Sequence, residues 1–132
     1  MSFMNNKRKA FTLVEIMITV AIIALLCAIA IPNLMRAKLN SNHASAQATL
    51  KAIANALETY AITNGVYPAQ MTSLIGAAPP YLNKDYFSGT FNGYNFSPTV
   101  TDYAYLVTAL PVSSSTGTVS YSITTGGVLT TN

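Results

Sequence analysis

The sequence has few of the residues that build most catalytic and metal sites. Of its 132 residues one is Cys, one is His, none is Trp, and only 8% are charged. A lone cysteine excludes an intrachain disulfide, and one His with one Cys does not supply the ligands of a usual zinc centre. Beyond Gly65 the only carboxylates are Asp85 and Asp102, too few for a usual calcium site. We therefore expect the protein to have no enzymatic activity and to bind no metal and no cofactor.

Charge is also scarce, and its excess lies at the N-terminus. The chain has seven Lys and Arg against four Asp and Glu, a formal net charge of +3. Three of the basic residues are consecutive, Lys7, Arg8 and Lys9, so residues 11–132 hold four basic and four acidic side chains. The composition of that part does not favour nucleic-acid binding.

A long apolar run follows the basic residues. From Ile16 to Ile31 the only ionisable group is the thiol of Cys27. Such a run is typical of a membrane-spanning helix, and the preceding basic residues orient its N-terminus towards the cytoplasm. A cleaved secretory signal is the alternative, with a weak small-residue site at 27–30. The helical pattern that continues beyond Pro32 argues against that alternative.

One carboxylate, Glu15, lies near the start of the apolar run. A charged side chain costs about 2.5–3.5 kcal/mol near the centre of a bilayer and less towards an interface, so Glu15 is a functional candidate that needs a partner. A cut between Ala10 and Phe11 would create an amino group that could neutralise Glu15, including the Glu15 of a neighbouring copy. The alternative is a first-turn acid that complements the helix dipole in the headgroup region. The residues alone leave both interpretations open.

Taken in order, the basic leader, the small residue and FTLVEIMITVAIIALLCAIAIP resemble the class III signal and N-terminal helix of type IV pilins and pseudopilins. The resemblance covers Lys7 to about Gly65 well and the rest loosely. It implies that prepilin peptidase cleaves after Ala10 and that Phe11 becomes the N-methylated first residue. It also implies that Glu15 sets subunit register and that Pro32 marks where the helix bends or melts in the fibre. The family usually has Gly before the cut, so Ala10 is a departure.

A second helical pattern continues beyond the apolar run. Apolar residues recur at helical spacing, and Asn64-Gly65 provides a stop in which Gly65 suits a left-handed cap. A helix from about residue 12 to 63 would be about 78 Å long, well over the thickness of a bilayer. Its second half therefore needs another surface to pack on, through the stripe Ala46, Leu50, Ile53, Leu57 and Tyr60.

The C-terminal third has the composition of strands joined by tight turns. Alternating apolar and polar residues and the Gly126-Gly127 pair predict a hairpin-rich antiparallel sheet. Between Val66 and Phe91 we expect a loop with a short helical turn at Thr72–Ile75, anchored by its apolar residues. The expected strands are Tyr94–Phe96, Tyr103–Leu110, Val119–Thr124 and Val128–Thr130.

The expected fold is α+β, with a long N-terminal helix packed against an antiparallel sheet of three or four strands. The first half of that helix is expected to be transmembrane. The expected organisation is a leader at 1–10, a transmembrane and assembly helix at 11–35, its amphipathic continuation at 36–64, and a loop and sheet head at 65–132.

The resemblance implies a structural subunit of a type IV pilus. Such a subunit waits in the inner membrane after cleavage, and an assembly platform and motor then extract it into a helical homo-oligomeric filament on the cell surface. The first alternative is a pseudopilin of a type II secretion system, working in the periplasm, although those typically have a carboxylate-rich calcium site that this chain lacks. The second alternative is a membrane-anchored binding module that never polymerises.

Overall fold

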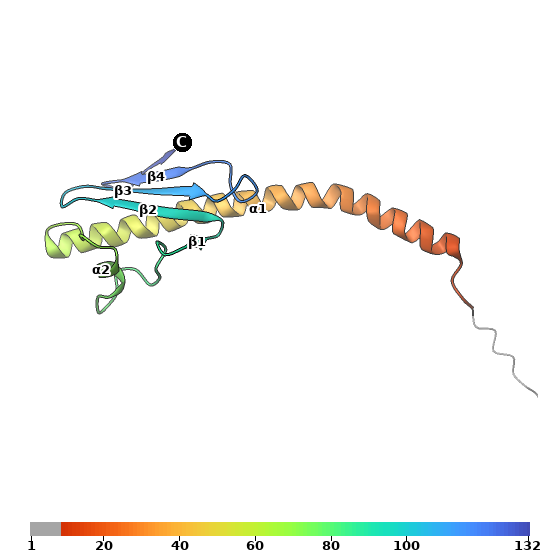
Figure 1. Ribbon diagram of the computed structural model, residues 1–132, viewed down its shortest axis with the longest axis horizontal. Coiled ribbons are helices and arrows are strands. Elements are labelled where there is room, and N and C mark those ends of the chain that lie inside the picture. The colour runs from red at the N-terminus through yellow and green to blue at the C-terminus, as the bar shows by residue number, and fades with distance from the viewer. Residues whose placement is uncertain (1–8) are drawn as a thin grey trace, which may run out of the picture. The chain divides into compact units, whose positions relative to one another are not determined.

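A computed structural model describes residues 9–132 and contains two helices and five strands in that part of the chain. The helices come first in the chain and the strands follow (Figure 1). The chain divides into two compact units, the first ending at Met35 and the second running from Arg36 to Asn132. The elements are α1 (Leu13–Asn64), α2 (Thr72–Ile75), β1 (Thr90–Phe91), β2 (Tyr94–Val100), β3 (Tyr105–Pro111), β4 (Tyr121–Thr124) and β5 (Val128–Thr131).

Helix α1 begins and ends within one residue of the predicted bounds. Its C-terminal stop is the predicted one, because Gly65 has a φ of 82° and its N–H donates to the carbonyl of Ala61 at 2.7 Å. Glycine adopts this left-handed conformation without the steric cost that a Cβ would bring. The side chain of Asn64 adds a bond to the carbonyl of Tyr60 at 3.0 Å. Helix α2 has the bounds expected for the short helical turn.

The sheet is antiparallel throughout and its strands follow chain order, β1-β2-β3-β4-β5. It has five strands where three or four were expected. The additional strand, β1, has two residues and pairs with β2 across Asn92-Gly93, whose φ values of 48° and 79° suit a tight hairpin turn. Strand β2 also extends beyond the expected Phe96 to Val100, with Pro98 opposite Val107.

The core lies between the second half of α1 and one face of the sheet. The predicted apolar stripe supplies Leu50, Ile53 and Leu57, each with no exposed surface. Burying one such side chain contributes about 1.5–3 kcal/mol relative to leaving it in water. The α+β prediction, with this helix face against the sheet, is confirmed. The sheet contributes Tyr94, Phe96, Tyr105, Val107, Ala109, Tyr121 and Ile123 to the same cluster.

The connection between α1 and β1 is fastened to this core by its own apolar residues, as expected. Tyr67, Leu74 and Leu82 are buried, and Tyr81 and Phe87 pack against the core from partly buried positions. The carbonyl of Leu74 accepts the N–H groups of Tyr81 at 2.9 Å and Leu82 at 3.0 Å. These residues therefore serve as anchors.

Gly117 provides a test of the packing beside Tyr94. A Cβ added to Gly117 would lie 2.7 Å from Tyr94 Cζ and 2.9 Å from the Cβ of Pro111. Because the core has no room for it, Gly117→Ala is expected to lower the free energy of unfolding by about 1–3 kcal/mol. Thermal unfolding of the full chain in detergent, followed by circular dichroism, measures this. Gly89→Ala is the control, since an added Cβ there meets open space. Equal melting temperatures for the two variants would contradict the prediction.

Candidate functional site

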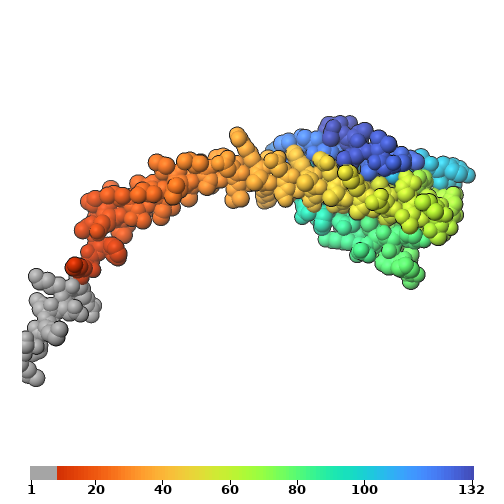
Figure 2. All heavy atoms as spheres, turned by 180° about the vertical axis from the view of Figure 1, so that it is seen from behind, coloured from red at the N-terminus to blue at the C-terminus, as the bar shows by residue number. Residues whose placement is uncertain are grey.

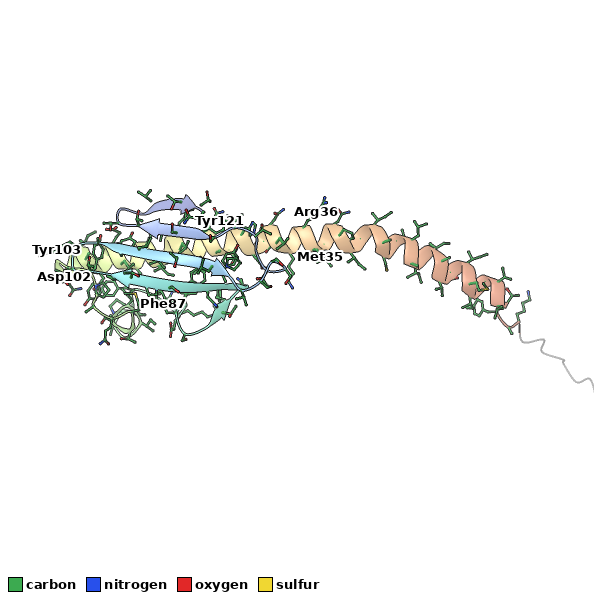
Figure 3. The ribbon with its side chains drawn as sticks, turned by 45° about the horizontal axis from the view of Figure 1, so that its top comes forward. Met35, Arg36, Phe87, Asp102, Tyr103 and Tyr121 are labelled. Carbon is green, nitrogen blue, oxygen red and sulfur yellow. The ribbon has the colours of Figure 1, made fainter. Side chains whose placement is uncertain are left out.

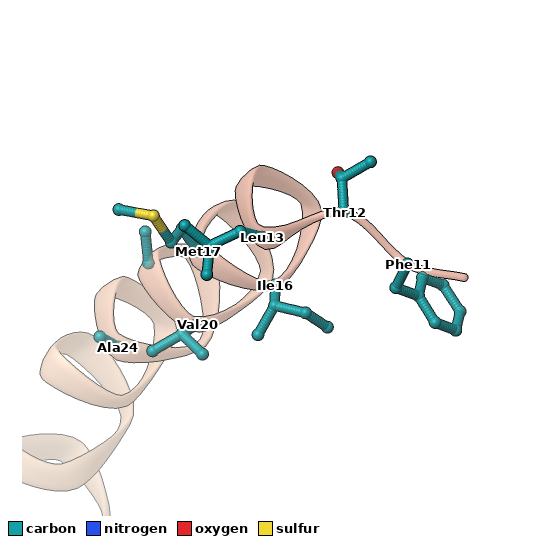
Figure 4. A pocket seen from close by; sticks show the side chains of 8 residues that line it. Phe11, Thr12, Leu13, Ile16, Met17, Val20 and Ala24 are labelled. Carbon is teal, nitrogen blue, oxygen red and sulfur yellow. The ribbon is translucent and has the colours of Figure 1, made fainter.

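The predicted cleavage site lies just before α1, outside the helix. Ala10 and Phe11 are both exposed, Phe11 to 83%, so the peptide bond between them is accessible to a peptidase. Lys9 is exposed as well, whereas Lys7 and Arg8 lie outside the described residues. Figure 4 shows the ring of Phe11 on the extended segment that precedes the first turn of the helix.

The first half of α1 presents apolar side chains on all sides. Every residue from Leu13 to Met35 is exposed, and the space-filling view shows this segment in orange (Figure 2). By length and composition α1 qualifies as a membrane-spanning helix. An apolar surface of this size in water marks a membrane or partner contact. A hollow of about 800 Å³ along its first turns is lined by Phe11, Thr12, Leu13, Ile16, Met17, Val20, Ala21 and Ala24 (Figure 4).

Glu15 caps the N-terminus of its own helix. Its Oε2 accepts the N–H of Thr12 at 2.6 Å and the hydroxyl of Thr12 at 3.0 Å. In return the N–H of Glu15 donates to Thr12 Oγ1 at 3.2 Å. This is the reciprocal capping box of the Thr-x-x-Glu pattern, which satisfies two backbone N–H groups that have no partner within the helix. The first-turn role that the sequence left open is therefore present.

Among residues 9–132, the capping box leaves the second oxygen of Glu15, Oε1, without a hydrogen-bond partner. Both bonds from Thr12 end on Oε2. Glu15 and Phe11 line a hollow of about 210 Å³ together with Lys9 and Ala10. They also line a second hollow, of about 560 Å³, with Ile16, Ile18 and Thr19. A cation from another molecule can thus reach Glu15 beside the predicted new N-terminus without displacing Thr12.

Pro32 lies inside α1, and the helix continues on both sides of it. Proline has no N–H, so the carbonyl four residues earlier, that of Ala28, loses its usual helical partner. The side-chain amide of Asn33 donates to the neighbouring carbonyl of Ile29 at 3.1 Å. The bending or melting expected at Pro32 concerns the assembled fibre and stays a prediction.

Glu58, which the sequence analysis did not single out, joins three parts of the head. Its Oε2 accepts the hydroxyl of Tyr67 at 3.1 Å, and its Oε1 accepts the N–H of Gly126 at 2.8 Å. The hydroxyl of Tyr105 in strand β3 accepts the N–H of the adjacent Gly127 at 3.2 Å. One helix carboxylate thereby holds the start of the loop and the β4–β5 turn, and Tyr105 ties strand β3 to the same turn. The signal in the sequence is a lone Glu next to Leu57 of the apolar stripe.

The alkaline stability of the head tests this cluster. Burial, then the hydrogen bond to Glu58 and its negative charge, raise the pKa of Tyr105 to about 12 from an ordinary value of 10.0. The unfolded chain therefore ionises first, so stability that is fully present below pH 10 is lost as the pH rises towards 12. The melting temperature is expected to fall across this window, and to fall less in Tyr105→Phe. Tyr103→Phe, at an exposed ring, is the control. A wild-type melting temperature that stays constant across the window would contradict the prediction.

His43 has a structural role, because it contacts the β3–β4 loop and strand β4. Its Nε2 accepts the N–H of Thr118 at 3.3 Å, and its ring meets that of Tyr121 edge-on at 6.0 Å. The adjacent Asn42 donates to the carbonyl of Thr116 at 2.8 Å. Together they fix the β3–β4 loop on the helix. In residues 9–132 no three His, Cys, Asp or Glu residues gather as a metal site would require.

Comparison with known proteins places these features in a family. Residues 5–31, which include Ala10, Phe11 and Glu15, match the family described as the prokaryotic N-terminal methylation motif. The chain is 38% identical over 80 residues to the type IV major pilin protein PilA of Myxococcus xanthus, which covers 61% of this chain and 36% of PilA. It is 38% identical over 64 residues to the type II secretion system core protein G of Escherichia coli, which covers 48% of this chain and 44% of that protein.

A third relative is matched over most of its length. The chain is 34% identical over 90 residues to the type IV wide pilus major component PilA4 of Thermus thermophilus, which covers 65% of this chain and 69% of PilA4. The chain thus spans less than half of the first two relatives and more than two thirds of the third. The methylation motif, the apolar helix that continues onto an antiparallel sheet, and the extent of the match to PilA4 agree, and the chain belongs to the family of type IV pilins and pseudopilins.

Proposed function

We propose that this chain is a structural subunit of a type IV pilus and has no enzymatic activity. Prepilin peptidase cleaves between Ala10 and Phe11 and methylates the amino group of Phe11, and the mature protein polymerises through residues 11–35. The observation that carries the proposal is the exposed carboxylate of Glu15 beside Phe11, whose Oε1 receives no hydrogen bond from residues 9–132, at the start of an apolar helix with no buried residue before Met35.

Polymerisation exchanges one apolar environment for another. In the membrane the helix is surrounded by lipid, and in a filament it is surrounded by the same helix of other subunits. Packing then holds the helices together, but a buried carboxylate without a partner would be costly. The methylated amine of a neighbouring Phe11 supplies that partner only at one axial offset. The pair therefore selects the register of each added subunit.

The proposed sequence of cleavage and assembly implies which partners the subunit has. Before assembly the subunit resides in the inner membrane, where the peptidase acts on it. An assembly platform and motor in that membrane then move it into the growing filament, which ends as an extracellular fibre. The names of the M. xanthus and T. thermophilus relatives, a major pilin and a major component of a wide pilus, support the pilus over other filaments.

Electron microscopy of cells tests the proposal. Surface filaments are expected on wild-type cells and not on cells that lack the gene, and mass spectrometry of sheared filaments is expected to find this chain as their protein. Absence of this chain from every surface filament would contradict the proposal. If the chain is found only as a membrane-bound monomer, the non-polymerising binding module is the better description.

The pseudopilin of a type II secretion system is the second candidate, favoured by the identity to core protein G of E. coli. It predicts that loss of the gene stops secretion of exoproteins while surface fibres persist. It also predicts that bound calcium stabilises the fold of the head. A fall in the melting temperature of the purified protein on addition of a calcium chelator would therefore favour this candidate over the pilin.

A further inference from the structure

The unit from Arg36 to Asn132 has opposite charges at its two ends. Arg36 and Lys38 are exposed in its first helical turn, and Asp102 is exposed in the turn between β2 and β3. That turn lies beside the C-terminal end of α1, because the carbonyl of Asp102 accepts the N–H of Tyr67 at 3.1 Å. Figure 3 shows Arg36 at one end of this unit and Asp102 with Tyr103 at the other. The helix between Arg36 and Asn64 gives a separation of about 42 Å.

The other charged groups of the unit are engaged or lie elsewhere. Glu58 is held by Tyr67 and Gly126, and the carboxylate of Asp85 accepts the N–H of Phe87 at 2.8 Å. The ammonium of Lys84 lies 4.2 Å from the centre of the Phe91 ring. Lys51 is exposed midway along the helix and belongs to neither end. Two cations at one end and one anion at the other thus remain for contacts with other molecules.

Tyr103 adds an aromatic ring to the acidic end. It is 81% exposed, whereas the tyrosines of the strands, Tyr94, Tyr105 and Tyr121, are at most 4% exposed. Ile62 is also exposed there, to 85%. A guanidinium group pairs with a carboxylate and stacks on an aromatic face, so neighbouring Asp and Tyr side chains together suit an arginine.

We propose that heads in the filament meet end to end, with Asp102 and Tyr103 of one copy against Arg36 and Lys38 of a copy further along the filament than the one whose amine pairs with Glu15. This inference rests on the proposed function, since it requires a polymer. The two surfaces differ, so the contact is head-to-tail, and it extends a fibre when the rotation between contacting copies does not close a ring. The offset between contacting heads is then the length of the unit, about 42 Å along the axis. Each exposed ion pair is weak, so the contact selects which surfaces meet and does not drive assembly.

Cross-linking in assembled filaments tests the contact directly. In a Cys27→Ala background of the full chain, Lys38→Cys combined with Tyr103→Cys is expected to give a ladder of covalent multimers when sheared filaments are treated with a short bis-maleimide. The pair Lys51→Cys with Tyr103→Cys is the matched control and is expected to remain monomeric. Filaments that assemble without the ladder in the first pair overturn the inference.

Charge reversal gives a second measure that does not use cysteines. Asp102→Lys is expected to lower filament yield about fivefold, because it places like charges together. Adding Arg36→Asp and Lys38→Asp to that variant is expected to restore the yield, whereas Lys51→Asp alone leaves it unchanged. Unchanged yield in Asp102→Lys, or no recovery in the combined variant, overturns the inference. Wild-type cells without filaments of this chain would instead contradict the proposed function, so the two failures are distinguishable.

Discussion

Glu15→Ala is expected to remain in the membrane but to form no filaments, or at most a small fraction of the wild-type number. The carboxylate supplies the only negative charge of the apolar helix, and without it the methylated amine of the next subunit would be buried without a partner. Removing one member of a buried pair typically costs about 3–5 kcal/mol. Membrane fractionation with quantitative electron microscopy of surface filaments measures both parts of the expectation.

A second substitution separates assembly from helix capping, since Glu15 also bonds Thr12. Thr12→Ala removes the capping hydroxyl, which is worth about 1 kcal/mol to the helix, but it keeps the charge of Glu15. We expect normal filaments from Thr12→Ala. If Thr12→Ala loses filaments as completely as Glu15→Ala, capping alone explains the requirement for Glu15. Normal filaments from Glu15→Ala would contradict the proposed pairing of Glu15 with the amine of Phe11.

Replacement of Ala10 by leucine is expected to leave the protein uncleaved and to abolish filaments. We expect a peptidase pocket shaped for glycine to admit the methyl group of alanine, which adds little volume, and to exclude the larger side chain of leucine. An uncleaved chain has no amine at Phe11 to pair with Glu15. Mass spectrometry of the intact protein distinguishes a chain that starts at methylated Phe11 from the full precursor.

The matched control for that prediction is Ala10→Gly, which restores the residue that the family usually has. Cleavage of this variant is expected to be at least as complete as that of the wild type. A wild-type protein that still starts at Met1 in cells with an active peptidase would remove the assignment of Ala10 and Phe11. Full processing of Ala10→Leu would show that the pocket does not read this side chain.

The sequence predicted those parts of the fold that leave a periodic or stop signal. The apolar stripe from Ala46 to Tyr60 repeats at helical spacing over several turns, so the helix face that packs on the sheet was identifiable. Gly65 was identifiable as the stop because few other residues adopt its φ of 82°. The anchors of the α1–β1 connection followed from the large apolar side chains within this loop.

The strands that were missed or shortened carry weaker signals. Strand β1 has two residues, too few for an alternation to be seen. Its hairpin turn, Asn92-Gly93, is a favourable turn sequence that goes unrecognised when the flanking strand is this short. Strand β2 runs to Val100, beyond the predicted Phe96, and it includes Pro98, a residue type that usually argues against a strand interior. Ser122 is buried on the polar side of β4, where its hydroxyl lies 2.7 Å from that of Thr130, so burial there does not follow the alternation.

In the candidate functional site, Glu15 could be predicted from its residue type and position, but the contacts of the site's side chains could not. Glu15 was identifiable because a carboxylate in an apolar helix is expensive, but its capping bonds to Thr12 depend on side-chain geometry. The role of Glu58 depends on Gly126, which lies 68 residues further along the chain. No local pattern encodes a contact of that separation. The prediction that a strand begins at Tyr103 was wrong, because strand β3 begins at Tyr105 and Tyr103 lies exposed in the turn before it.

The fastening of the C-terminal hairpin through Glu58 has a consequence for where the protein can mature. Hydrogen bonds form as soon as the partners meet and require no oxidant, unlike a disulfide staple. The head can therefore reach its native state without an oxidoreductase, and thiol reductants in the surroundings do not loosen it. The fold of the head is therefore expected to be the same under reducing and oxidising conditions.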